Sequence, residues 1–203
     1  MSIDGKVHAL IGGFLDVSSK AEEILQKTEF VLVGAGRNDA DIDREKETFL
    51  KALRQYEDQT FAFLLHYQPV ARDLRMVSAI IKTLSDVERI GVQGCDIRKI
   101  IRKDKLSPES IGRDGLALMA QKAREMTSSA LDAFARNDKE LAQRVIDSDD
   151  IVDREFSTLK ERISQRMTGA KTEPTDIDKI MIGKYLERIA DHACSVSWRV
   201  LSL

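Results

Sequence analysis

The chain has 203 residues, a third of them charged, with 32 lysines and arginines against 34 aspartates and glutamates. This near balance argues against a dedicated nucleic-acid-binding protein, which usually carries a basic excess. The longest apolar runs, such as 30–33 and 61–65, fall far short of the ~20 residues that span a bilayer. The first ten residues lack the pattern of a secretory signal, and two cysteines make no disulfide framework, so a cytoplasmic protein is expected.

Six long helices are predicted, because segments rich in Ala, Leu, Ile, Lys, Glu and Arg alternate with prolines and short polar breaks. No segment shows the alternation of apolar and polar residues that is typical of strands. Long helices joined by short connections indicate antiparallel bundles. The predicted helices are residues 4–33, 39–67, 70–104, 108–136, 138–168 and 175–202.

The third and the last predicted helices carry apolar seams with the same spacing. Apolar residues recur in alternating steps of four and three, which is typical of helices that pack at shallow angles. The two seams superpose under a shift of 99 residues, which indicates an internal duplication. The seam of the last helix consists of Ile182, Leu186, Ile189, Ala193, Val196 and Val200. The seam of the third consists of Met76, Ile80, Thr83, Val87, Ile90, Gly94, Ile97 and Ile101.

A motif within these helices repeats with the same shift. The stretch DVERIGVQGC at 86–95 superposes on YLERIADHAC at 185–194. The first copy lacks the acid of the second, since Val92 stands where Asp191 is expected.

A second match supports the duplication. The stretch NDADIDRE at 38–45 superposes on SDDIVDRE at 148–155 under a shift of 110 residues. The sequence therefore predicts an all-α protein of two tandem three-helix bundles, residues 1–105 and 106–203.

The second copy predicts a metal site. Glu187 and Asp191 are four residues apart, so both leave one face of a helix, and Asp149 and Asp153 have the same spacing on the preceding helix. If these faces meet, four carboxylates repel one another unless a cation lies between them. Oxygen ligands of this kind suit Fe, Mn, Mg, Ca or Zn.

The first copy offers a poorer set of ligands. Its acids are Asp39, Asp43 and Glu88, and Val92 supplies no oxygen. Asp96, one turn further along, could partly substitute. The first site is therefore predicted to be weaker than the second.

Other interpretations of these residues remain open. The acids could form a solvated helix face, or Arg89 and Arg188 could neutralise them as structural ion pairs. Cys95 and Cys194 are expected to be small packing residues rather than ligands. No nucleophile with an adjacent base is recognised, so no enzyme is predicted.

The sequence resembles the PhoU family, the phosphate-transport accessory and regulatory proteins of bacteria and archaea. The resemblance covers nearly the whole chain and rests on the two Asp-rich helix starts and on three further motifs. These are QPVARDLR (68–75), DVERIG (86–91) and YLERIADHA (185–193). The motif that is repeated at 86–95 and 185–194 reads ERIGDHA in both copies in the family. The first copy of this chain departs from it with ERIGVQG.

The resemblance implies a cytoplasmic homodimer that carries multinuclear metal clusters and signals phosphate sufficiency. Iron or zinc is the expected metal, with manganese, magnesium, calcium or nickel as alternatives. The implied partners are the ATPase of a phosphate ABC transporter and a sensor histidine kinase, both of which the protein would restrain. Association with the membrane would then occur only through these partners.

Three alternatives compete with this function. A ferritin-like di-iron enzyme would need Glu-x-x-His motifs, and the chain has none. A purely structural adaptor would bind no metal. An accessory of another phosphate carrier would keep the family but change the partner, and the neighbouring genes would distinguish it.

Overall fold

The computed structural model describes residues 3–35, 41–169 and 171–203, and every regular element in these ranges is an α-helix. The predicted all-α class is therefore confirmed. The helices are α1 (Ile3–Leu32), α2 (Ile42–Tyr67), α3 (Ala71–Asp104), α4 (Pro108–Arg113), α5 (Leu116–Arg136), α6 (Lys139–Asp147), α7 (Asp149–Thr168) and α8 (Asp176–Ser202).

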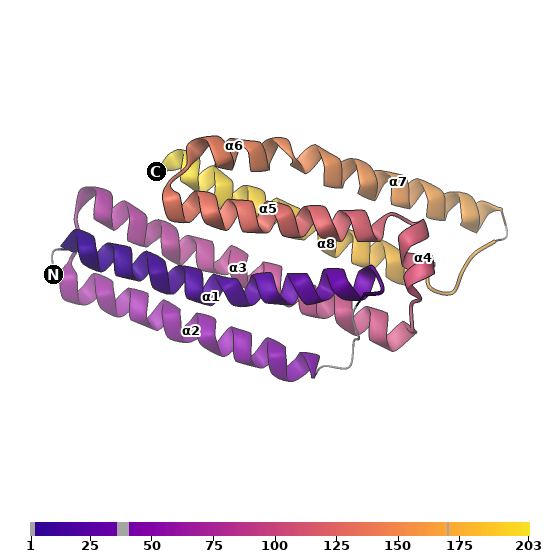
Figure 1. Ribbon diagram of the computed structural model, residues 1–203, viewed down its shortest axis with the longest axis horizontal. Coiled ribbons are helices and arrows are strands. Elements are labelled where there is room, and N and C mark those ends of the chain that lie inside the picture. Colours follow the sequence, from indigo (N-terminus) through magenta and orange to yellow (C-terminus); the bar gives the residue numbers. More distant parts are fainter. Residues whose placement is uncertain (1–2, 36–40, 170) are drawn as a thin grey trace.

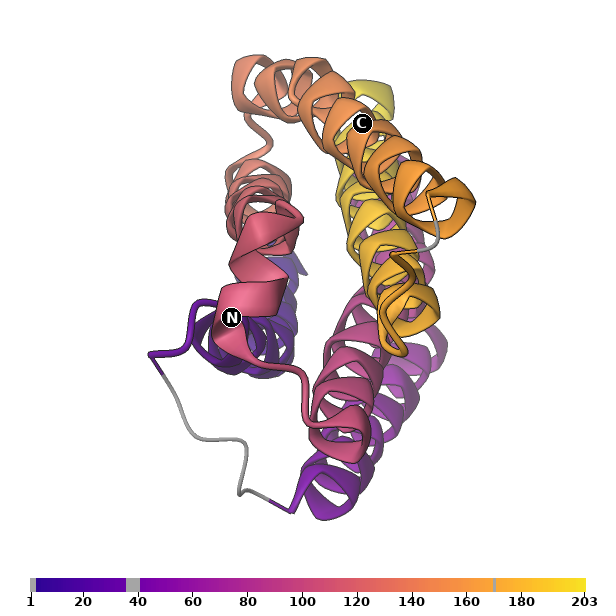
Figure 2. The ribbon, with the colours of Figure 1, turned by 90° about the vertical axis from the view of Figure 1, so that its right-hand side faces the viewer.

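Four helices form the centre of the molecule and the others flank it. In the first unit α1 and α3 pack together, with α2 against both. In the second unit α5 and α8 pack together, covered by α6 and α7. The units join where α3 meets α8 and α1 meets α5, so that α2 lies at one edge of the stack and α6 and α7 at the other (Figures 1 and 2).

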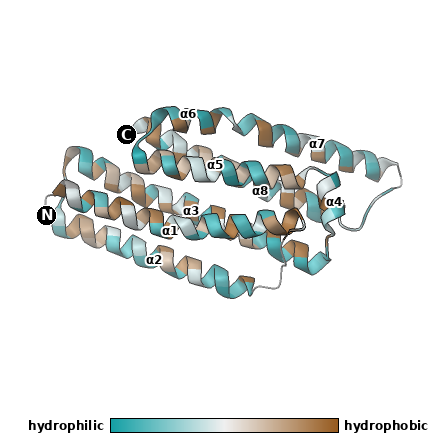
Figure 3. Cartoon of the chain, viewed as in Figure 1, coloured by the Kyte–Doolittle hydropathy of each residue, from teal (hydrophilic) through white to brown (hydrophobic). Residues whose placement is uncertain are grey.

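The apolar seams point into this centre as predicted. Every seam residue of α8 is buried, and so is every seam residue of α3 except the partly buried Met76. One continuous apolar core runs from Phe14 and Phe49 in the first unit to Phe134 and Leu186 in the second. Along the helices, apolar residues recur between polar ones (Figure 3). Burial of this shared core couples the two units into one folded body.

Two of the six predicted helices are interrupted. The helix predicted at 108–136 breaks at Asp114 and Gly115, where Gly115 adopts a left-handed φ of 82°. The helix predicted at 138–168 breaks at Ser148, whose Oγ donates to the carbonyl of Arg144 at 2.7 Å. The prediction of single helices was wrong because glycine permits the first break and a local serine hydrogen bond accompanies the second.

The other helix ends agree with the prediction to within a few residues and have local causes. Asp41 caps α2 by accepting a hydrogen bond from the backbone N–H of Arg44 at 3.1 Å. Ser107 caps α4 ahead of Pro108, and Asp138 caps α6. The predicted start of the second helix at residue 39 lies outside the described residues.

A buried ionic network joins α7 and the start of α8 to the break between α4 and α5. Lys179 of α8 is fully buried and lies 2.9 Å from Asp114 and 2.7 Å from Glu173, measured from its Nζ to a carboxylate oxygen of each. Arg166 of α7 bonds Asp114 at 2.7 Å and the buried Asp176 at 2.6 Å. Burial opposes ionisation of Asp114, yet hydrogen bonds from Arg166 and Lys179 hold its pKa below the ordinary value.

The two units are also tied by a polar contact in their interface. Asp86 of α3 is buried and bonds Arg199 of α8, while Nδ1 of His192 lies 2.8 Å from the other oxygen of Asp86. His192 is thus an interhelix hydrogen-bonding residue.

Across the described ranges, no helix combines the length and the apolar character that a membrane crossing would need.

Candidate metal centre

The structure places the four acids of the second repeat close enough for their charges to repel one another. Asp149 and Asp153 lie at the start of α7, and Glu187 and Asp191 lie on the middle of α8. Burial, followed by repulsion from Asp153 and Asp191, raises the pKa of Asp149 to about 6. Burial and the neighbouring Glu187 also raise the pKa of Asp191. These shifts mean that negative charge accumulates here without full compensation.

Little positive charge opposes this cluster. Lys184 reaches Glu187 at 2.5 Å from the same helix. Arg188, which could have neutralised the acids, is exposed and pairs with none of them among the described residues. Cys194 is buried beside Asp149, and burial together with that carboxylate raises the pKa of its thiol to about 12. In the absence of a metal this thiol is therefore neutral, and its role as a small packing residue stays a prediction.

The chemistry of these acids fits a cation, but their side chains are not in ligating positions. Within residues 3–35, 41–169 and 171–203, no three Asp, Glu, His or Cys side chains form a group that could hold a metal ion. Binding would require the carboxylates to turn toward one another and Lys184 to release Glu187. The assignment of Asp149, Asp153, Glu187 and Asp191 as ligands therefore stays a prediction.

The first repeat differs because basic side chains already neutralise three of its acids, Asp43, Glu45 and Asp96. Asp43 pairs with Lys99, and this hydrogen bond lowers the pKa of Asp43. Asp96 pairs with Lys46 at 2.9 Å, so it is not available as the substitute ligand that the sequence suggested.

Glu45 is neutralised from two sides. It bonds the buried Arg98 and also Lys27, the latter at 2.6 Å. Burial opposes its ionisation, but these two hydrogen bonds hold its pKa below the ordinary value. Of the remaining predicted ligands of this repeat, Glu88 is exposed and Asp39 lies outside the described residues.

The duplication shows how the two repeats diverged. Under the shifts that superpose their motifs, Lys46 corresponds to Phe156, Arg98 to Ser197 and Lys99 to Trp198. These three bases, each of which neutralises an acid in the first repeat, are thus replaced by uncharged residues in the second. The sequence contained this signal, but it was missed because these bases lie just outside the motifs that were compared between the copies.

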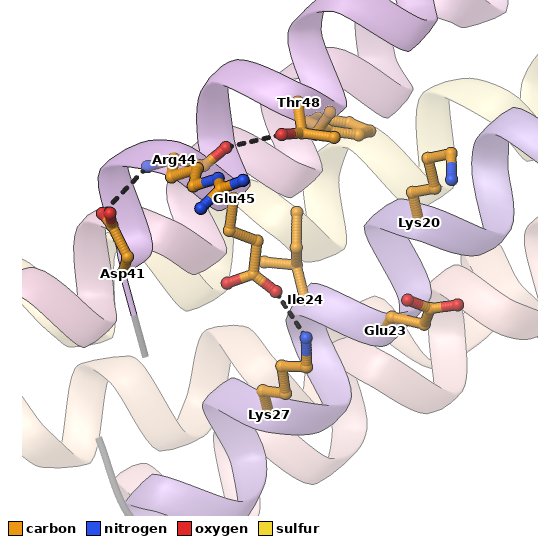
Figure 4. A pocket seen from close by; sticks show the side chains of 9 residues that line it. Lys20, Glu23, Ile24, Lys27, Asp41, Arg44, Glu45 and Thr48 are labelled. Carbon is orange, nitrogen blue, oxygen red and sulfur yellow. Dashed lines mark hydrogen bonds and ion pairs between the residues drawn. The ribbon is translucent and has the colours of Figure 1, made fainter. Parts of the chain in front are cut away.

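A pocket beside Glu45 shows the same balance of charge. It has a volume of about 360 Å³ between α1 and α2. Figure 4 shows the Lys27–Glu45 ion pair together with the cap that Asp41 forms on Arg44. Three bases and three acids line it, namely Lys20, Lys27, Arg44, Glu23, Asp41 and Glu45. The side chains that line this pocket therefore carry no excess of either charge.

These pairs revise the expected effect of restoring the missing acid. The alignment of the copies predicted that Val92→Asp would raise metal occupancy of the first site. Because Lys46 and Lys99 already neutralise the neighbouring acids, we expect Val92→Asp alone to add no metal. Adding Lys46→Phe and Lys99→Trp should create a second occupied site, measured as metal per chain by elemental analysis. Added metal in the single variant would contradict this expectation.

Comparison with known proteins identifies the family. The PhoU domain profile matches residues 16–101 and 116–200. The chain belongs to the PhoU family.

Curated relatives in this family are named phosphate-specific transport system accessory protein PhoU homologs. The chain is 32% identical to the one from Synechocystis over 79% of the chain and 70% of that protein. It is 34% identical to the one from Pseudomonas putida, covering 74% of the chain and 59% of the relative. It is 30% identical to homolog 1 from Methanothermobacter thermautotrophicus, covering 92% and 90%. These names describe accessory proteins rather than enzymes.

Solved structures share the fold. PhoU from Pseudomonas aeruginosa superposes with a TM-score of 0.82 at 23% identity, covering 98% of this chain and 97% of that one. The phosphate transport system regulatory protein PhoU from Streptococcus pneumoniae gives a TM-score of 0.84 at 22% identity, covering 98% and 95%. The prediction of two tandem PhoU-like three-helix bundles is thereby confirmed.

Proposed function

We propose that this PhoU-family chain is a metal-binding, non-enzymatic regulator of phosphate uptake and of phosphate-starvation signalling. Its partners would be the ATPase of a phosphate ABC transporter and a sensor histidine kinase, and it would act in the cytoplasm as a homodimer. The family and the names of the relatives support the link to phosphate transport. The uncompensated carboxylates around Asp149 support the metal.

The observation that carries the metal is the contrast between the repeats. In the first repeat Asp43, Glu45 and Asp96 have basic partners, whereas the residues of the second repeat that match Lys46, Arg98 and Lys99 are uncharged. A bound cation would supply the missing positive charge and act as a Lewis-acidic bridge to a partner's oxygen ligands. Asp149, Asp153, Glu187 and Asp191 would hold it. Iron or zinc is the first expectation.

A structural adaptor without metal is the second candidate. It is favoured by the side-chain positions, since no ligating group of three is assembled in the described part of the chain. In that case the elevated pKa of Asp149 would let protonation, rather than a cation, relieve the repulsion. Metal content separates the two candidates.

The metal prediction is tested by the double change Glu187→Ala and Asp191→Ala. We expect this variant to lose most of the metal that elemental analysis finds in the purified protein, because half of the proposed ligands are gone. The control is Asp43→Ala, which removes an acid of the first repeat that Lys99 neutralises. Asp43→Ala should keep its metal, and equal metal content in wild type and double variant would favour the adaptor.

The regulatory role is tested in cells with a reporter of phosphate-starvation genes at high phosphate. A deletion strain should leave the reporter active, and the double variant should do the same while circular dichroism shows intact helices. A silent reporter in the deletion strain would contradict the regulatory function. An active reporter in the deletion strain but not in the double variant would support the regulatory function and exclude the metal as its switch. An adjacent gene for a phosphate ABC transporter would favour that carrier over another.

A further inference from the structure

A groove lies between the start of α3 and the end of α8, away from the acids of the proposed metal site. Its volume is about 360 Å³. Figure 1 shows these two helix ends near each other at the end of the molecule that also holds the start of α1. It is lined by Leu74, Arg75, Ser78, Ala79, Lys82, Arg199, Ser202 and Leu203. Two of these, Leu74 and Arg75, belong to the QPVARDLR segment, which the proposed metal site does not use.

The backbone beside the groove is held in an unfavourable conformation that exposes apolar side chains. Gln68 and Ala71 have left-handed φ values of 45° and 49°, which non-glycine residues rarely adopt. Val70, between these two residues, is 73% exposed, and Leu74, in the first turn of α3, is 43% exposed. Leu65, in the last turn of α2, is 80% exposed. Folding alone gains nothing from exposing apolar groups on a strained turn, so this feature points to a partner.

The ionisable side chains that line the groove are all basic. Its ionisable side chains are Arg75, Lys82 and Arg199. Arg199 already bonds Asp86 in the interface between the units. Arg75 and Lys82 are exposed, and no carboxylate pairs with either in the described part of the chain. The groove is therefore an apolar channel with a basic rim.

We propose that this groove binds an acidic amphipathic helix of a partner protein. Apolar side chains of that helix would lie against Leu74 and Ala79, and its flanking carboxylates would pair with Arg75 and Lys82. A free inorganic anion does not account for the mostly apolar walls. A flat lipid surface does not account for the concave shape.

The geometry distinguishes this surface from the proposed metal site. Binding of the helix requires neither the metal nor the acids of α7. Failure of this proposal would leave the proposed function intact, and loss of metal would leave the groove intact.

The test uses the full-length chain and a fluorescein-labelled helical peptide of about 18 residues, or about five turns. The peptide carries Leu at positions i, i+3, i+4 and i+7 with Glu on both flanks. A second peptide replaces each Glu by Lys, and a third replaces each Leu by Ser. Fluorescence anisotropy should show the acidic peptide binding at least about tenfold more tightly than either of the others.

Two variants and their matched controls locate the site. Leu74→Ser and Lys82→Glu should each weaken binding of the acidic peptide by about tenfold or more. Met181→Ser is the control for the first, because Met181 is 42% exposed on α8 away from the groove. Lys103→Glu is the control for the second, because Lys103 is an exposed lysine near the other end of α3. Both controls should bind like wild type, and thermal unfolding should show that all four variants fold.

Other outcomes overturn the proposal. Equal binding of the Glu and Lys peptides, or equal loss in a variant and its control, would show that the groove does not select an acidic helix. Binding to phosphatidylglycerol vesicles that Lys82→Glu abolishes, without peptide binding, would assign the surface to a membrane. Stabilisation by inorganic phosphate that Lys82→Glu abolishes would assign it to the free anion. A dimer that Leu74→Ser dissociates in sedimentation experiments would assign it to a second copy of the chain.

Discussion

Replacement of Lys179 by alanine should lower the free energy of unfolding by about 3–5 kcal/mol, because it breaks a buried ionic network on one side. The ammonium group of Lys179 is fully buried and contacts the carboxylates of Asp114 and Glu173. Without it, the buried Asp114 and Asp176 retain Arg166 alone as an ionic partner within the described residues. Two desolvated carboxylates would then share a single positive charge. Urea unfolding followed by circular dichroism measures the loss.

The matched control for this change is Lys122→Ala. Lys122 forms an ion pair with Glu125 at 2.7 Å, but this pair lies on the surface and within one helix. Pairs of that kind contribute about 0–1 kcal/mol. A loss below about 1 kcal/mol in Lys179→Ala would mean that water solvates Asp114 and Asp176 once the lysine is gone. The network would then not be what stabilises the packing of α8 against the break between α4 and α5.

Replacement of Asp149 by asparagine should stabilise the metal-free protein at neutral pH. The pKa of Asp149 is raised from 3.8 to about 6 in the folded state, so folding favours the protonated form. Above about pH 6 this carboxylate is ionised in both states, and the fold bears the full cost of its burial and repulsion. Asparagine removes the charge, and the gain after solvent screening is about 1–2 kcal/mol.

The difference in unfolding free energy between wild type and Asp149→Asn should depend on pH. As the pH falls from 6 toward 3.8, the folded state takes up the proton before the unfolded state does, so the penalty disappears. Wild type and Asp149→Asn should therefore differ at pH 7 and converge near pH 4 in urea unfolding. Asp150→Asn is the control, since Asp150 is exposed on the next position of α7. A constant difference across this range would show that repulsion around Asp149 is not its cause.

The sequence determined the helical class, the duplication and the position of the acids of the second repeat. Each of these depends on local periodicity, since residues four apart share a helix face whatever the helix packs against. Glu187 and Asp191 could therefore be placed together, and so could Asp149 and Asp153. The apolar seam of α8 also fixed which side of that helix would be buried.

The tertiary structure decided which helix faces meet. It thereby also decided which acids of each repeat are neutralised. Lys46 and Lys99 are far in sequence from the acids that they neutralise, so spacing within one helix could not reveal these pairs. The break at Gly115 adjoins Asp114, whose ionic partners Arg166 and Lys179 lie about 50 and 65 residues away along the chain. The basic groove likewise exists only because α3 and α8 lie side by side. Ionic contacts between helices depend on the packing of the whole chain, which the periodicity of a single helix does not specify.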